Sequence, residues 1–148
     1  MTVTEAKHRN RLGRLILNSN LVFGGLIILF YIMRGFDDDE FTELLKILIP
    51  IKTAYLTALT RYVVANRNVI GPKEGDDDLR VNSLFASTSY IMVSVHISTL
   101  ITAVSLYALF NMIDFKDLIN IILGVETFFG VYVGLIIASM FKVETDEK

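Results

Sequence analysis

The stretch Leu118–Phe141 reads LINIILGVETFFGVYVGLIIASMF and contains one charged side chain, Glu126. An α-helix rises about 1.5 Å per residue, so this stretch is long enough to cross a hydrocarbon core about 30 Å thick. Three further apolar stretches precede it in the chain, and they cover Leu15–Met33, Leu44–Val64 and Leu84–Phe110. The sequence therefore predicts an all-α, polytopic membrane protein whose four transmembrane helices form one bundle, with residues 1–148 as a single domain.

The composition of the chain excludes several classes of protein. Of its 148 residues 53% are hydrophobic, and the segments outside the four apolar stretches are too short to form a globular catalytic or nucleotide-binding domain. The formal net charge of −2 offers no basic surface, so direct binding of nucleic acid is not expected. The chain has no cysteine, which excludes disulfides, zinc–thiolate sites and cysteine catalysis.

No catalytic or cofactor-binding motif is present in the sequence. There is no phosphate-binding glycine loop, no Gly-x-Ser-x-Gly motif and no cluster of histidine and acidic residues at the end of a helix. His96 has no second histidine or cysteine inside the four stretches to complete a metal site. We therefore expect neither enzymatic activity nor a cofactor or bound metal.

The distribution of basic residues predicts how the helices are oriented. Lysine and arginine are frequent in the N-terminal segment, in the connection between the second and third stretches, and in the C-terminal tail, whereas the other two connections carry only Arg34 and Lys116. By the positive-inside rule both termini should lie in the cytoplasm. Residues 65–83 would then be the largest surface offered to a cytosolic partner, together with the termini, although this segment could also be a simple linker.

An internal similarity relates the second stretch to the fourth. Phe41–Thr53 and Phe115–Thr127 align with four identical and five conservative pairs, and Phe30-Tyr31 aligns with Leu106-Tyr107 upstream. The alignment predicts two parallel helical-hairpin repeats, related by a pseudo-twofold axis along the membrane normal, with the acidic run Asp37–Glu40 in the longer connecting loop. Chance is the alternative, because Leu/Ile matches are common between membrane helices.

The aligned repeats place Lys52 over Glu126. Each residue lies about 12 Å inside the outer end of its predicted helix, a depth at which an isolated charge is costly. We expect the two side chains to form an intramembrane charge pair, which is either a static ion pair that fixes the packing of the helices or part of a gate. His96, Lys46 and Glu43 are further candidates for a gate or a proton-linked element, and a hydrogen-bonded interior histidine is the alternative for His96.

Two series of small residues predict helix contacts. Glu126, Gly130, Gly134 and Ala138 follow one another at steps of four, so the small side chains form a groove in which another helix, from the same bundle or from a second subunit, packs closely. The third apolar stretch carries hydroxyl groups along one sector of its helix, and we expect them in an oligomer contact. A hydrated path is the alternative, and single hydroxyls also bond to their own helix backbone. These residues are Ser87, Ser94, Ser98 and Thr102.

In size and hydropathy the chain resembles the small four-helix membrane subunits found beside cytosolic partners in bacterial operons, including phage-defence operons. No sequence motif carries this resemblance. It implies a non-enzymatic protein of the bacterial inner membrane that forms a homo-oligomer and serves as a membrane platform, sensor or effector with a cytosolic partner. The alternative function is a small ion or proton channel or transporter that uses the Lys52–Glu126 pair.

Overall fold

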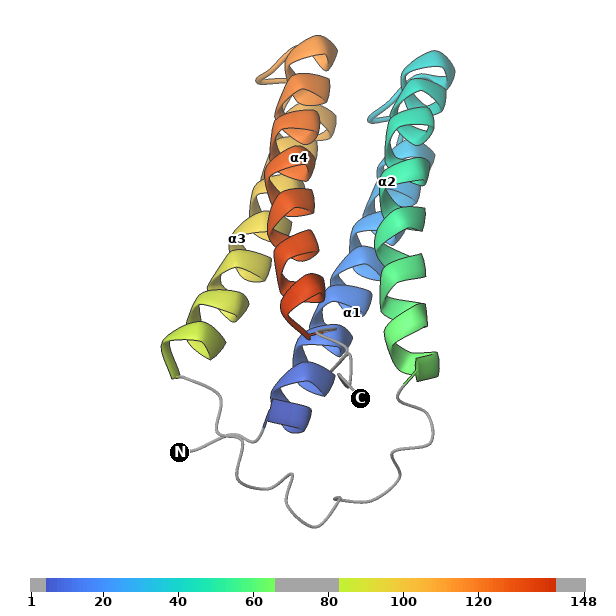
Figure 1. Ribbon diagram of the computed structural model, residues 1–148. Coiled ribbons are helices and arrows are strands. Elements are labelled where there is room, and N and C mark those ends of the chain that lie inside the picture. The colour runs from blue at the N-terminus through green and yellow to red at the C-terminus, as the bar shows by residue number, and fades with distance from the viewer. Residues whose placement is uncertain (1–4, 66–82, 141–148) are drawn as a thin grey trace, which may run out of the picture.

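Four helices make up the part of the chain that the computed structural model describes, which is residues 5–65 and 83–140 (Figure 1). They are α1 (Glu5–Ile32), α2 (Asp38–Ala65), α3 (Ser83–Ala108) and α4 (Phe115–Met140), and the described residues contain no strand. The prediction of an all-α chain with four helices is confirmed.

The acidic run Asp37–Glu40 forms the beginning of α2, which corrects its predicted position in a loop. The backbone N–H of Glu40 donates to Oδ1 of Asp37 at 2.8 Å, and the backbone N–H of Asp37 donates to Oε2 of Glu40 at 3.1 Å. These reciprocal bonds form a capping box, so Asp37 caps α2 and the next three residues form its first turn. Acidic side chains are favourable there because the amino end of a helix carries partial positive charge.

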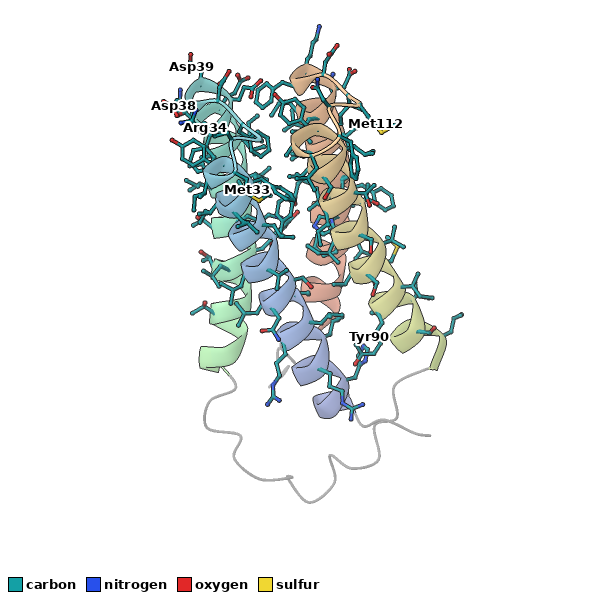
Figure 2. All side chains as sticks on the ribbon, turned by 180° about the vertical axis from the view of Figure 1, so that it is seen from behind. Met33, Arg34, Asp38, Asp39, Tyr90 and Met112 are labelled. Carbon is teal, nitrogen blue, oxygen red and sulfur yellow. The ribbon has the colours of Figure 1, made fainter. Side chains whose placement is uncertain are left out.

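Both hairpins turn at the same end of the molecule (Figure 1). Helix α1 is followed by Arg34, whose φ is 61°, and helix α3 by Asn111, whose φ is 50°. These left-handed residues let backbone N–H groups reach back to carbonyls at the helix ends, from Gly35 to Phe30 at 2.8 Å in the first turn. The acidic residues Asp38 and Asp39 and the basic Arg34 gather at this end (Figure 2).

Two tyrosines connect the helices near the turns. The hydroxyl of Tyr31 in α1 donates to Oδ1 of Asp38 at 2.9 Å, and the hydroxyl of Tyr107 in α3 donates to Oε1 of Glu40. The second bond joins one hairpin to the other. The Tyr31 ring also stacks on Phe41, with the ring centres 4.0 Å apart. Acidic residues of the first turn of α2 therefore also bind the neighbouring helices at this end.

The packing order of the helices overturns the predicted pseudo-twofold axis. Helix α1 packs on α2 and α3, helix α4 packs on α3 and α2, and within the described residues the pairs α1–α4 and α2–α3 make no close backbone approach. A twofold axis would place equivalent helices on the diagonals, with α1 beside α4. The hairpins instead lie side by side and point the same way, with α1 beside α3 and α2 beside α4 (Figure 1). A sideways translation, rather than a rotation, therefore relates one hairpin to the other.

The burial pattern of α2 and α4 follows the alignment of their sequences. Leu44 and the aligned Leu118 are both fully buried, and Leu48 and Ile122 are also buried. Burial on a shared face is what two copies of a hairpin would produce, and a common origin of the two hairpins stays a prediction. These side chains belong to the larger core cluster near the turns, which also contains Phe23, Ile27, Phe30, Phe36, Leu100, Ala103 and Val104.

Much of the apolar surface of the helices faces outward. Two described segments, Arg11–Ile32 and Ser87–Ala108, are long and apolar enough to cross a membrane by length and composition. Less than a third of the residues in the most apolar window of each segment are buried inside the bundle. Large side chains such as Met33 and Met112 project from the bundle near the turns (Figure 2). The structure therefore agrees with the prediction of membrane-spanning helices to the extent that two of the four described helices could span a bilayer.

Gly35 provides a test of how the two hairpins meet. A Cβ atom at Gly35 would lie 2.8 Å from Cβ and 2.9 Å from the carbonyl oxygen of Ala108, so backbone would have to move. We expect Gly35→Ala to lower the free energy of unfolding by about 1–3 kcal/mol, as overpacking does. Gly24→Ala is the matched control, because a Cβ there meets nothing within 4 Å. Equal unfolding curves for the two variants in detergent would contradict the contact.

Candidate functional site

A buried ion pair between α2 and α4 forms the centre of the candidate site. Nζ of Lys52 donates to Oε1 of Glu126. The Glu126 side chain is 1% exposed, and the Lys52 side chain is 20% exposed. A buried carboxylate needs such a partner, because removing an ion from water without compensation costs several kcal/mol, of order 3–5 when one partner of a pair is lost. The structure thus brings together the two residues that the aligned repeats placed at equal depth.

His96 of α3 lies near the same carboxylate. Its Nε2 is 3.8 Å from Oε1 of Glu126, which is longer than a hydrogen bond, and its side chain is 6% exposed. The imidazole stacks on the Phe129 ring, with the ring centres 3.8 Å apart and the planes 15° from parallel. Within the described part of the chain, neither ring nitrogen of His96 has a hydrogen-bond partner, and neither does Oε2 of Glu126.

Aromatic rings enclose the ion pair. The ammonium of Lys52 lies 5.3 Å from the centre of the Phe23 ring in α1 and 5.6 Å from the centre of the Tyr55 ring. Both distances are within the range of a cation–π interaction. The Tyr55 hydroxyl donates to the backbone carbonyl of Glu126 at 3.0 Å. All four helices therefore meet at this charge, and α1 contributes through an aromatic ring.

Phe23 and Tyr55 were not among the residues predicted for the site. Tyr55 lies three residues after Lys52 on the same helix, so helical spacing alone would have placed both on one face. Phe23 had no comparable signal. Which ring of α1 faces the charge depends on which helices are neighbours, and the apolar pattern of the sequence leaves this order open.

A groove between α1 and α2 leads to Lys52. It encloses about 240 Å³, and apolar side chains form most of its lining. Lys52 and Asn20 both border it. The Asn20 side chain donates through Nδ2 to the carbonyl of Ile16 at 2.8 Å, whereas its buried Oδ1 has no hydrogen-bond partner in the described residues. The groove is therefore lined by a cation and by an amide side chain whose buried oxygen accepts no hydrogen bond from the described residues.

The other candidates for a gate lie away from this cluster. Glu43 and Lys46 are exposed on α2, and the structure does not bring them to Glu126. The hydroxyl-bearing residues of α3 are exposed along the outside of the bundle, and they comprise Ser87, Ser94, Ser98 and Thr102. His96 and the buried Ser89 occupy the inner side of the same helix.

Gly130 faces the neighbouring helix of the same bundle. A Cβ atom at this position would lie 3.3 Å from the Tyr55 hydroxyl of α2. Gly130 therefore lies beside α2 of the same bundle, and an oligomer contact through the small-residue groove stays a prediction. Gly134 and Ala138 belong to α4, but the structure does not describe their surroundings. The segment predicted as a partner surface lies outside the described residues, except for its ends at Ala65 and Ser83. The same holds for residues 1–4 and 141–148.

His8 was considered only as part of a basic N-terminal region, and the structure buries it. Its ring meets the Tyr90 ring of α3 edge-on, with the ring centres 5.2 Å apart. Burial lowers the pKa of His8 from its ordinary value, because the charged imidazolium is poorly solvated there. An imidazole between basic residues gives no sequence signal for burial, so only the packing of α1 on α3 shows it.

The cluster offers proton chemistry and no metal chemistry within the described residues. No group of three or more histidine and acidic side chains that could hold a metal ion occurs among them. An ammonium, a carboxylate and an imidazole meet at one buried point, so a proton or a hydrogen bond could pass between them. The fold and site define an all-α four-helix bundle with a buried Lys52–Glu126 ion pair at its centre.

Comparison with known proteins adds no family. No family model, no curated protein and no solved structure matches this chain. The function of this chain must therefore be inferred from the site itself.

Proposed function

We propose that this chain is a non-enzymatic integral membrane subunit that forms a homo-oligomer and acts as a platform, sensor or effector with a cytosolic partner. The exposed hydroxyls of α3 carry this proposal. They lie within Ser87–Ala108, a segment apolar enough to cross a membrane, and on the outside of the bundle. Small hydroxyl side chains are enriched where membrane helices pack closely, so a second subunit is the natural cover for this face.

The proposed placement has four membrane spans, both termini in the cytoplasm and the turns outside. The two segments that could cross a bilayer, in α1 and α3, both run from the end away from the turns toward the turns (Figure 1). The basic N-terminal residues belong to that end, and the acidic first turn of α2 belongs to the other. This asymmetry supports the positive-inside orientation. The bacterial inner membrane and a role in defence follow from the resemblance in size and hydropathy.

A small proton or ion channel or transporter is the second candidate function. The observation that favours it is the buried polar cluster, where both nitrogens of His96 and one oxygen of Glu126 have no hydrogen-bond partner among the described residues. Ionisable groups inside membrane bundles commonly mark ion or proton pathways. The groove between α1 and α2 reaches Lys52, the ion-pair partner of Glu126.

Cysteine cross-linking in vesicles tests the first proposal, since the chain has no cysteine of its own. We expect Ser98→Cys to form disulfide-linked dimers, because this side chain is exposed on the proposed contact face. Ser89→Cys is the matched control on the same helix and should stay monomeric, because Ser89 is buried. Equal cross-linking of both variants, or none at either position, contradicts the contact. Proton flux in the same vesicles without any partner would support the second candidate.

A further inference from the structure

We propose that Glu126 is shared between two cations, and that protonation of His96 transfers it from Lys52 to His96. In the proposed second state the imidazolium of His96 pairs with Glu126, and the ammonium of Lys52 moves to Oδ1 of Asn20 in the α1–α2 groove. The inference deepens the proton-linked function and rests on it.

The geometry around the carboxylate supports the exchange. Oε1 of Glu126 already accepts from Lys52, and the same oxygen lies 3.8 Å from Nε2 of His96. A shift of roughly 1 Å would bring Nε2 to the usual hydrogen-bond distance. A neutral imidazole can donate one N–H group, whereas an imidazolium also adds a positive charge in a site with little water, where electrostatic interactions are strong. Glu126 carries a single negative charge, so an imidazolium and an ammonium beside it repel each other and compete for it.

The groove gives the displaced ammonium a place to go. Lys52 and Asn20 border the same space of about 240 Å³. Nδ2 of Asn20 is held by the carbonyl of Ile16, while Oδ1 is buried and accepts no hydrogen bond from the described residues. The flexible lysine side chain carries its charge at the end of four methylene groups, so it can turn within the groove. The exchange thus gives a hydrogen-bond partner to Nε2 of His96 and to Oδ1 of Asn20, which have none among the described residues in the present state.

The charged and titratable groups around His96 and the Phe129 ring stacked on it come from α4 and α2. Helix α4 supplies Glu126, and also Tyr132, which packs on the Phe129 ring. Helix α2 supplies Lys52 and Tyr55, whose ring meets Phe129 edge-on. Helix α1 adds the ring of Phe23. Uptake of one proton therefore changes the cluster from neutral to singly positive, and loss of that proton returns Lys52 to Glu126.

Solid-state NMR of the full chain in vesicles tests the exchange. The histidine signal that is missing from the His96→Gln spectrum belongs to His96, because the chain has only one other histidine. On acidification we expect an imidazolium signal from His96 together with loss of the contact between Nζ of Lys52 and the Glu126 carboxyl carbon. A contact between Nζ and the side-chain carbonyl carbon of Asn20 should appear at the same pH. An imidazolium that forms while the Lys52–Glu126 contact persists would overturn the proposal.

Two variants separate the exchange from a general change in packing. Lys52→Met removes the competitor, so the midpoint of His96 protonation should rise by about one pH unit, a tenfold change in proton affinity. Asn20→Leu removes the acceptor in the groove, and the midpoint should fall. Unchanged midpoints in both variants would refute the competition. Proton flux is measured separately, so exchange without flux would reject only the proton path, whereas flux without exchange would reject this inference.

Discussion

Replacing Lys52 by Met is expected to lower the free energy of unfolding by about 3–5 kcal/mol, because it leaves the carboxylate of Glu126 buried without its ion-pair partner. Glu126→Gln should cost less. The Lys52 side chain is 20% exposed and borders the groove, so its ammonium keeps access to other acceptors, whereas the Glu126 side chain is 1% exposed. Unfolding of the purified protein in mixed micelles, followed by circular dichroism, measures both losses.

The double variant Lys52→Met/Glu126→Gln should recover much of the stability, since no lone charge remains. A double-mutant cycle then gives an interaction energy for the pair. Additive losses would contradict a direct interaction and would remove the central contact of the site. If stability recovers but proton flux or partner-dependent activity does not, the pair takes part in function beyond holding the helices together.

The ion pair shows what the sequence could predict about the site. The alignment of Phe41–Thr53 with Phe115–Thr127 placed Lys52 and Glu126 at equal depth, and their opposite charges then made them natural partners. Depth along a helix follows from residue count, because the helical rise is constant. The structure brings these two residues together, and the role of the pair in function stays a prediction.

The neighbours of each helix could not be predicted in the same way. Helical periodicity shows which side chains share a face, but two parallel hairpins can pack in more than one order around that face. The predicted pseudo-twofold axis was wrong because α1 lies beside α3 rather than α4. The approach of His96 to Glu126 depends on this packing order. Because the sequence does not reveal the order, it did not predict that the histidine lies beside the ion pair.

The acidic run shows a different kind of error, since its signal was present in the sequence. Aspartates are frequent in turns, which suggested a loop. Asp37 followed three residues later by Glu40 also fits the capping pattern of an N-cap acceptor with a reciprocal acidic partner, and the structure uses it in this way. The local rule for the beginning of a helix was therefore more informative than the composition of the segment.

Phe129→Ala is expected to be the second strongly destabilising change. The Phe129 side chain is 2% exposed, stacks on His96 of α3 and meets the Tyr55 ring of α2 edge-on at 5.6 Å. Truncating a buried phenylalanine costs about 3–5 kcal/mol in water-soluble cores. In lipid the transfer part of this cost is small because the surroundings are also apolar, so we expect the cavity part, about 2–3 kcal/mol.

The adjacent Phe128 is the matched control for this effect. It is 68% exposed on the outside of the same helix, so Phe128→Ala should change stability by less than about 0.5 kcal/mol. Equal losses for the two variants would show that burial in the bundle does not determine stability here. Phe129→Ala should also free the His96 ring, because the flat stack holds the imidazole beside the carboxylate. A broadened His96 signal in this variant, and an unchanged one in Phe128→Ala, would show that the same ring supports both the packing and the proton-accepting geometry.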